Sequence, residues 1–215
     1  DITIFTLDFK KLFGHYERVD IDTTFRYGNL INNISSEFIQ KNPSQLEKTG
    51  EETVVLTFDK GEFIAINGTV NNPQKNIKKL NELASAYAIG RDIHVGDTIV
   101  GLKGRVGFEA AAALIVIKAH HLLEKHTLTK WQLQHKDYLA NFYGMHLHEG
   151  QYLDPVMRNM EAFLESSQRQ VSGTVSVTLK PYHFTLNGIS SKHDLMNAKF
   201  GSYGELNTGW TADEA

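Results

Sequence analysis

The chain has 215 residues, enough for one domain or for one and a half. Hydrophobic residues make up 41% and charged residues 22%, which is ordinary for a folded globular protein, and the net charge of −3 argues against nucleic acid as the main partner. The absence of cysteine excludes a disulfide scaffold, a thiolate metal site and a cysteine nucleophile.

The first third of the chain begins with weak signals and ends with a strong one. We expect a short strand at 2–5, a helical turn or two at 8–16 and a loop at 26–38. Hydrophobic and polar residues then alternate through 53–58 and, after a Lys-Gly turn, through 62–67. A period of two on both sides of a turn predicts an antiparallel β-hairpin.

Helical periodicity dominates the middle of the chain. Apolar residues recur at helical spacing from Ile77 to Tyr87, and Gly90 is expected to stop that helix. A second helix with an apolar body is predicted over Glu109–Glu124.

Two later helices are predicted from signals at their starts. Thr129 is a plausible N-cap of a helix that Gly144 is expected to end. Asp154 followed by Pro155 is a cap and a first-turn proline, which together predict another helix start.

The end of the chain returns to strand patterning. Residues 171–179 and 183–189 alternate in hydrophobicity around a proline break, which predicts a second hairpin. We therefore expect an α+β (mixed α/β) fold: a largely antiparallel sheet with hairpins at 53–67 and 171–189, flanked by three or four helices.

Nothing in the sequence predicts a membrane segment. The longest apolar run, Ala110–Ile117, is too short to span a bilayer, and no signal-peptide pattern is present. We therefore expect a cytoplasmic location. Because the chain starts at Asp1 rather than Met and stops at the acidic 211-TADEA-215, we expect it to be a piece of a longer protein.

The segment between the first two helices is rich in glycine and charge. Its glycines match neither a dinucleotide fingerprint nor a P-loop, so spacing alone favours a set of turns and a close backbone approach between helices. Charged and polar side chains are interspersed among these glycines: Arg91, His94, Asp97, Lys103, Arg105 and Glu109. Such a surface also suits a small, multiply charged substrate, because guanidinium groups bind carboxylates through two hydrogen bonds.

Histidines and serines give weaker signals. His120, His121 and His126 lie near a predicted helix C-terminus, where the helix dipole favours them, so a structural role is preferred to a zinc site. His146 and His148, on an extended chain, would face one ion, but no third ligand is in view and a polar loop is the simpler interpretation. No Gly-x-Ser-x-Gly motif or triad pattern is present, so we assign no catalytic residue and no metal site.

The glycine-rich segment and the second hairpin together resemble the argininosuccinate synthase family. The segments that carry the resemblance are 90-GR-91, 92-DIHV-95, 101-GLKGRVGFEA-110, 119-AH-120, 127-TLT-129, 166-SSQRQVSGTVSVTL-179 and 188-GISSKHDLMN-197. They follow the family's order from about Glu51 to the end of the chain. More loosely, 1-DITIFT-6 resembles the last strand of the family's nucleotide-binding domain, and 18-RVDIDTTFRY-27 resembles the linker after it.

The resemblance implies a division at residue 50. Residues 1–50 would be the end of the nucleotide-binding domain and a linker, and residues 51–215 the synthetase and oligomerisation domain. The family's ATP-binding Ser-Gly-Gly-x-Asp-Ser loop is absent from this sequence.

The resemblance also implies a ligase of arginine biosynthesis and the urea cycle. The family joins citrulline to aspartate with ATP and Mg²⁺, releasing AMP and pyrophosphate, and forms homotetramers. ATP and Mg²⁺ would be bound mainly by an N-terminal domain, while the present part supplies one wall of the citrulline pocket. The tail 200-FGSYGELNTGW-210 is expected to cross to another subunit, because its aromatic residues cannot bury themselves locally.

Three positions depart from the family pattern. The citrulline-binding glutamate falls on Gly96, the citrulline-binding tyrosine falls on Phe108, and the linker serine falls on Gly28. Each replacement removes a polar group. The substrate-binding candidates that remain, with the two altered positions, are Gly96, Asp97, Lys103, Arg105, Phe108 and Glu109.

Three explanations fit these departures. The charged residues read the substrate in a variant pocket, the substrate is a modified citrulline such as an acylated one, or this copy no longer catalyses and only assembles with partners. The first is favoured, because the surrounding Gly-Leu-Lys-Gly-Arg frame is kept.

Overall fold

The computed structural model describes residues 45–97 and 100–197. Its main body is a five-stranded antiparallel sheet in the order β3-β2-β1-β6-β7, and β4 and β5 form a separate two-stranded sheet. The strands are β1 (Glu52–Asp59), β2 (Glu62–Ile66), β3 (Thr69–Val70), β4 (Arg91–Asp97), β5 (Lys103–Glu109), β6 (Gly173–Lys180) and β7 (His183–Ser190). The helices are α3 (Pro73–Ser85), α4 (Ala111–Thr127), α5 (Lys130–His148) and α6 (Pro155–Ser167), with short 3-10 turns η1 (Gln168–Gln170) and η2 (Leu195–Asn197).

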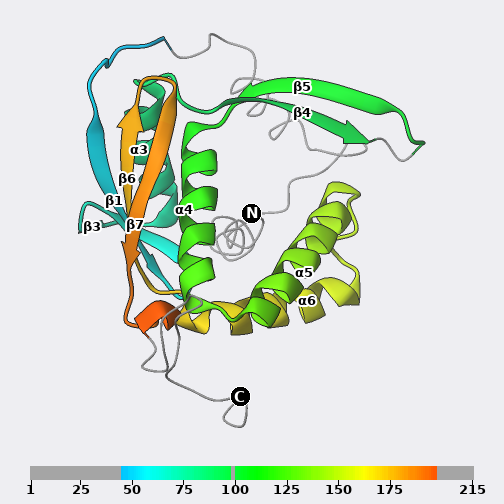
Figure 1. The fold of residues 1–215 in the computed structure, drawn as a ribbon. Coiled ribbons are helices and arrows are strands. Elements are labelled where there is room, and N and C mark those ends of the chain that lie inside the picture. Colours follow the sequence, from blue (N-terminus) through cyan, green and yellow to red (C-terminus); the bar gives the residue numbers. More distant parts are fainter. Residues whose placement is uncertain (1–44, 98–99, 198–215) are drawn as a thin grey trace, which may run out of the picture.

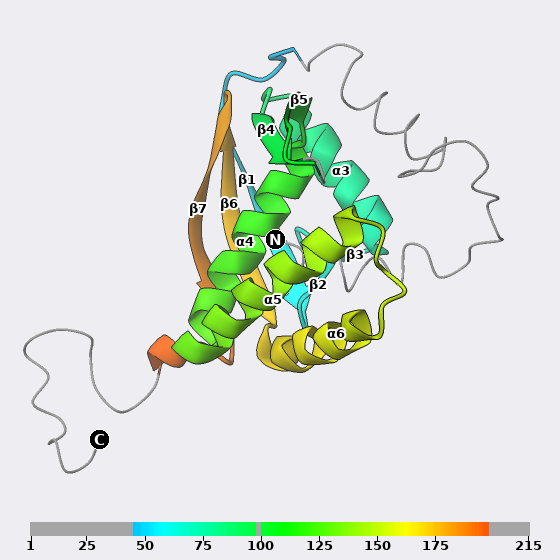
Figure 2. The ribbon, with the colours of Figure 1, turned by 90° about the vertical axis from the view of Figure 1, so that its right-hand side faces the viewer.

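Helices α3 and α4 cover one face of the five-stranded sheet (Figures 1 and 2). The strands alternate because that face is buried: Val54 pairs with Val177 and Leu56 with Val175, and all four side chains have no exposed area. On the opposite face the hydroxyls of Thr53 and Thr178 lie 3.0 Å apart. The predicted α+β class with a largely antiparallel sheet is confirmed.

Both predicted hairpins are present. In the first, β1 and β2 pair in register Thr57↔Ala65; in the second, β6 and β7 pair in register Thr178↔Thr185. Strand β6 also pairs with β1, so the two hairpins join at the centre of one sheet. Residues that are far apart in the chain therefore close a single core.

The predicted helix starts at Thr129 and Asp154 are confirmed. The Thr129 hydroxyl accepts from the backbone N–H of Gln132, whose side chain accepts from the Thr129 N–H in return, which completes a capping box. The Asp154 carboxylate accepts from the N–H of Val156, and Pro155 fills the first turn of α6.

Helix ends were predicted less well than starts. Gly144 does not end α5, which continues to His148 because a glycine inside a helix costs only about 1 kcal/mol. Helix α3 ends at Ser85, before Gly90, and α4 runs from Ala111 to Thr127 rather than from Glu109 to Glu124.

The glycine-rich segment is a β-hairpin rather than a set of turns. Strands β4 and β5 pair from Arg91↔Glu109 at the base to Asp97↔Lys103 near the tip, and the ribbon extends away from the sheet (Figure 1). At its base the N–H of Ala110 donates to the carbonyl of Gly90 over 2.8 Å. Gly90 has φ of 104°, and a Cβ there would collide with the backbone of Ala111, so the hairpin starts in close contact with α4.

Helices α5 and α6 pack against each other around Tyr143, Met157 and Met160. Within the described ranges, no helix is both long and apolar enough to cross a membrane. The elements predicted at 2–5, 8–16 and 26–38, and the tail 200–210, lie outside the described residues.

Candidate functional site

The β4–β5 hairpin carries all six substrate-binding candidates. Gly96 and Asp97 end β4, and Lys103 and Arg105 begin β5 opposite them. Phe108 and Glu109 lie at the other end of β5. At roughly 3.3 Å per residue, Lys103 and Glu109 are about 20 Å apart, so one small molecule does not bridge all six candidates.

The register divides the candidates between two faces of the hairpin. Residues directly opposite each other share a face, and neighbours along a strand alternate. One face carries Arg91, Ile93, Val95, Asp97, Lys103, Arg105 and Glu109; the other carries Asp92, His94, Gly96, Gly104 and Phe108. Lys103 and Arg105 therefore face the same side of the hairpin, whereas Gly96 and Phe108 lie on the opposite side.

Two ion pairs on the charged face engage four of its side chains. Lys103 pairs with Asp97 at the tip, and Arg91 Nε lies 3.3 Å from Glu109 Oε2 at the base. Asp97 and Glu109 are thus paired with Lys103 and Arg91 rather than with Arg105. Within the described part of the chain, the exposed Arg105 guanidinium makes no hydrogen bond or ion pair, so it is positioned to bind a carboxylate from outside.

The histidines at the end of α5 are arranged differently from the expectation. His146 and His148 lie on the last turn of a helix, not on an extended chain, so residues two apart do not face one ion. His146 Nδ1 lies 3.1 Å from the Phe142 carbonyl oxygen. Among the residues that the structure describes, no group of three or more His, Asp or Glu side chains is arranged to hold a metal ion.

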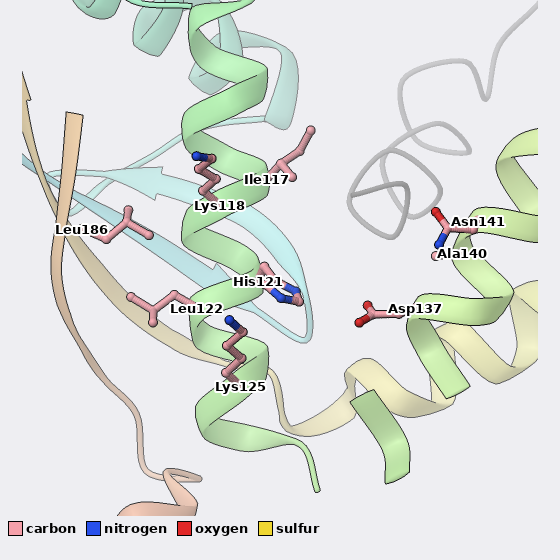
Figure 3. A pocket seen from close by; sticks show the side chains of 9 residues that line it. All are labelled: Ile117, Lys118, His121, Leu122, Lys125, Asp137, Ala140, Asn141 and Leu186. Atoms are coloured by element: carbon pink, nitrogen blue, oxygen red, sulfur yellow. The ribbon is translucent and has the colours of Figure 1, made fainter. Parts of the chain in front are cut away.

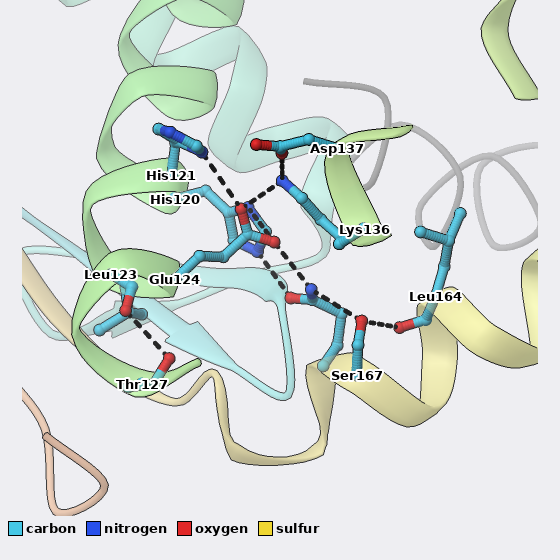
Figure 4. Close-up of polar contacts among 10 residues, drawn as sticks. His120, His121, Leu123, Glu124, Thr127, Lys136, Asp137, Leu164 and Ser167 are labelled. Carbon is cyan, nitrogen blue, oxygen red and sulfur yellow. Dashed lines mark hydrogen bonds and ion pairs between the residues drawn. The ribbon is translucent and has the colours of Figure 1, made fainter. Parts of the chain in front are cut away.

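His120 belongs to a buried polar network that joins α4, α5 and η1 (Figure 4). Its Nε2 lies 3.0 Å from Gln168 Oε1, and Gln168 Nε2 donates to Glu124 Oε1 over 2.8 Å. The other Glu124 oxygen accepts from Lys136 Nζ at 2.6 Å and lies 3.5 Å from His121 Nδ1. Lys136 also contacts Asp137 at 2.9 Å.

Burial and charge set the protonation states in this network. Burial by itself disfavours the charged carboxylate of Glu124, but His120 in its protonated form, His121 and Lys136 outweigh burial in acid and lower the pKa of Glu124 to about 2. Burial lowers the pKa of His120 below its ordinary value of 6.5. We therefore assign a charged Glu124–Lys136 pair beside a neutral His120 at neutral pH.

Of this network, the sequence analysis singled out only His120 and His121, to which it gave a structural role. Lysine is rarely buried, and nothing in the pattern places Lys136 next to Glu124 on another helix. The spacing of His120 and Glu124, four residues apart on a predicted helix, was the one local signal available.

An open pocket of about 540 Å³ lies between α4, α5 and β7 (Figure 3). Lys118, His121 and Lys125 of α4 line it, together with Asp137 of α5 and Leu186 of β7. None of the six candidates lines this pocket. The hairpin remains the candidate site, because it presents the available Arg105 guanidinium and carries the residues of the family resemblance.

Comparison with known proteins gives consistent matches. A family model described as the Arginosuccinate synthase C-terminal domain matches residues 30–213. The argininosuccinate synthase of Xanthomonas campestris pv. campestris is 37% identical over 163 residues, which cover 76% of this chain and 41% of that protein. The argininosuccinate synthases of Methanocaldococcus jannaschii and Dictyoglomus turgidum are 34% and 32% identical over 165 residues, covering 77% of this chain and 41% and 42% of those proteins. The chain thus spans well under half the length of these relatives.

Proposed function

The chain belongs to the argininosuccinate synthase family, and from that premise we propose that the complete protein is a ligase that joins aspartate to citrulline or to an acylated citrulline. The observation that carries the proposal is the match of the family model over residues 30–213. This chain would supply the domain on the citrulline side.

The proposed reaction has two balanced steps. The ureido oxygen of the citrulline substrate attacks the α-phosphorus of ATP and releases pyrophosphate. The amine of aspartate then attacks the activated ureido carbon, AMP leaves, and argininosuccinate or its acylated form results. The aspartate nitrogen loses a proton in this second step.

The β4–β5 hairpin would be the substrate-facing element of this domain. Arg105 is suited to a substrate carboxylate, because its guanidinium is exposed and Asp97 and Glu109 are already paired. Lys103 lies two residues away on the same face and adds a second cation. Two cations suit a citrulline with an extra acyl carboxylate better than plain citrulline.

ATP and Mg²⁺ would be held mainly by residues outside those described. The described ranges contain no group of carboxylates and histidines suited to a metal ion, and the sequence lacks the family's phosphate-binding loop. We further propose that the protein acts in the cytoplasm as a homotetramer in arginine biosynthesis.

The test uses the complete protein with ATP, Mg²⁺ and aspartate, and compares citrulline with N-acylated citrullines. Pyrophosphate release that depends on all substrates, together with the condensation product in the mass spectrum, is the expected result. The 215-residue chain alone should release no pyrophosphate. Release by this piece would overturn our placement of the nucleotide site.

A complete protein that releases no pyrophosphate with any citrulline, yet forms a stable oligomer, would contradict the ligase proposal. It would favour a scaffold role instead. Light scattering of the same sample measures the mass, and a monodisperse monomer would contradict the proposed tetramer.

A further inference from the structure

Helix α5 is apolar on two faces. One face packs against α4 and α6, and its buried residues are Lys136, Ala140 and Tyr143. The other face exposes four large apolar side chains: Trp131 (61%), Tyr138 (69%), Phe142 (42%) and Met145 (53%). Of the helices that the structure describes, α5 is the only one with such exposed side chains. A helix that is apolar on both faces is normally covered on both.

The exposed side chains follow a heptad pattern. Trp131, His135, Tyr138, Phe142 and Met145 succeed one another at alternating steps of four and three residues, the spacing by which two helices pack in a coiled coil. We call these five residues the α5 seam. The rings of Tyr138 and Phe142 stack with their centroids 6.4 Å apart, so the centre of the seam is a continuous aromatic surface. At 1.5 Å per residue, the seam is about 21 Å long.

The α5 seam is matched to itself. Trp131 and Met145 lie equally far from Tyr138, on either side of it. Two antiparallel copies that cross at Tyr138 therefore place Trp131 of each against Met145 of the other, and contacts between a thioether and an aromatic ring are favourable. No other helix in the described ranges exposes an apolar seam that would fit it.

Charges at the two ends of α5 favour the antiparallel arrangement. Lys130 is the first residue of the helix, and Glu149 is its C-cap. Antiparallel copies bring Lys130 of one near Glu149 of the other and oppose the two helix dipoles, whereas parallel copies place like charges together. The exposed residues Gln134 and Asn141, which flank the seam between these ends, are uncharged, so two copies meet there without repulsion.

We propose that the α5 seam is a contact between two copies of this chain, in which two α5 helices pair antiparallel around Tyr138. The proposal goes beyond the ligase reaction, and it rests on the proposed function only in requiring that the complete protein is an oligomer. The six substrate-binding candidates lie on β4 and β5, so this contact does not use them.

The test places charges at the centre of the contact in the complete protein. In Tyr138→Glu and in Tyr138→Lys like charges meet across the two copies, so each variant should raise the dissociation constant of the oligomer by about thirtyfold or more in analytical ultracentrifugation. Mixing the two variants brings opposite charges together and should restore the wild-type mass. The control is Tyr182→Glu, because Tyr182 is also an exposed tyrosine, at 63%, and lies outside the seam; its mass should equal that of the wild type.

A second measurement tests the direction of the helices. The variants Trp131→Cys and Met145→Cys are mixed and oxidised, and the linked peptides are identified by mass spectrometry; the chain described here contains no other cysteine. Antiparallel pairing predicts a disulfide between the two different variants, because a disulfide forms only where two Cα atoms come within about 7 Å. Parallel pairing predicts disulfides within each variant instead.

Each failure has a separate meaning. An unchanged dissociation constant in both charged variants would overturn the proposal, and so would dissociation without recovery on mixing, which would show that the seam packs against another part of the protein. Disulfides within each variant would overturn the antiparallel arrangement. A monomeric wild-type protein would overturn the proposed tetramer together with this contact, while its pyrophosphate release would still decide the ligase function independently.

Discussion

Two lysine–carboxylate pairs lie in opposite surroundings in this molecule. Lys136 and Glu124 join α5 to α4, and their side chains are 1% and 0% exposed. Lys103 and Asp97 join β5 to β4 near the tip of the hairpin, and their side chains are 65% and 56% exposed. Both pairs join an ammonium to a carboxylate, but the buried pair is shut off from water and shares its network with Gln168 and His121.

The difference in exposure separates charges that stabilise the fold from charges that are available for binding. A buried charge that loses its partner is not solvated by water instead, so separating the buried pair costs several kcal/mol, about 3–5 kcal/mol when one partner is removed. An exposed pair is worth about 0–1 kcal/mol, because water solvates either charge when the pair opens. The hairpin can therefore exchange an internal partner for a ligand, whereas the network under α4 cannot.

The sharpest test of the comparison is to remove the ammonium from the buried pair. Lys136→Met leaves Glu124 charged and buried, and we expect the free energy of unfolding to fall by about 3–5 kcal/mol. Urea unfolding measures the loss. Lys130→Met, at an exposed position of the same helix, is the control and should change it by less than about 0.5 kcal/mol.

Removing both charges should recover much of that loss. In Lys136→Met/Glu124→Gln no charge stays buried, so we expect the double variant to be more stable than Lys136→Met alone. A double variant that is less stable would show that packing around Lys136, rather than charge, accounts for the effect.

Acidification should destabilise the buried region in two stages. Burial lowers the pKa of His120 in the folded chain. Below about pH 6.5 the imidazole is therefore protonated in the unfolded chain but not in the folded chain, and the free energy of unfolding falls. The pKa of Glu124 falls from 4.5 to about 2 on folding, so the stability that this carboxylate contributes is present above pH 4.5 and is lost as the pH drops towards 2.

Urea unfolding at pH 7.5, 5.5 and 3.5 measures both stages. The variant His120→Gln removes the first titration, so its stability should change less between pH 7.5 and 5.5 than that of the wild type. An identical change in both proteins would contradict the assignment of a neutral, buried His120.

On the hairpin, the largest expected effect concerns activity rather than stability. Arg105→Ala in the complete protein should lower kcat/KM by roughly tenfold or more, equivalent to ~1.4 kcal/mol, because the guanidinium would bind a substrate carboxylate. The thermal midpoint should barely move, since Arg105 has no partner in the described ranges. A lower midpoint with unchanged kinetics would make Arg105 a scaffold residue.

The smallest expected effect comes from breaking the exposed pair. Lys103→Met removes the partner of Asp97, and the free energy of unfolding should change by no more than about 1 kcal/mol. A loss comparable with that of Lys136→Met would erase the contrast between the two regions.

The five-stranded sheet was predictable because one face of it is buried, so that hydrophobic and polar residues alternate along its strands. In β1 and β6 one side packs on α3 and α4 and the other faces solvent, so hydrophobic and polar residues alternate. In the β4–β5 hairpin the alternation extends over only two apolar residues in each strand, Ile93 and Val95 in β4 and Val106 and Phe108 in β5. Its apolar residues Ile93 and Val95 are 60% and 56% exposed, and its glycines are typical of turns.

The candidate site was located by resemblance, and its geometry came from the register. The sequence indicated a charged, glycine-rich surface, and the register showed that Lys103 and Arg105 share one face while Gly96 and Phe108 lie on the other. The buried network was not predicted, for a different reason. Gln168 lies 44 residues from Glu124 in the chain, and periodicity does not report which distant side chains meet.

Because of the close contact at the base of the hairpin, a small change of angle there moves the distant tip by several ångströms. Gly90 lies against the backbone of Ala111, at the start of a helix that the core holds in place, so the base of the hairpin is fixed. Seven residues of extended strand make an arm of about 23 Å, so a tilt of about 10° at the base would displace the tip by about 4 Å. A larger side chain at Gly90 would therefore move the tip of the hairpin, which we propose to face the substrate, without changing any of the six candidate residues.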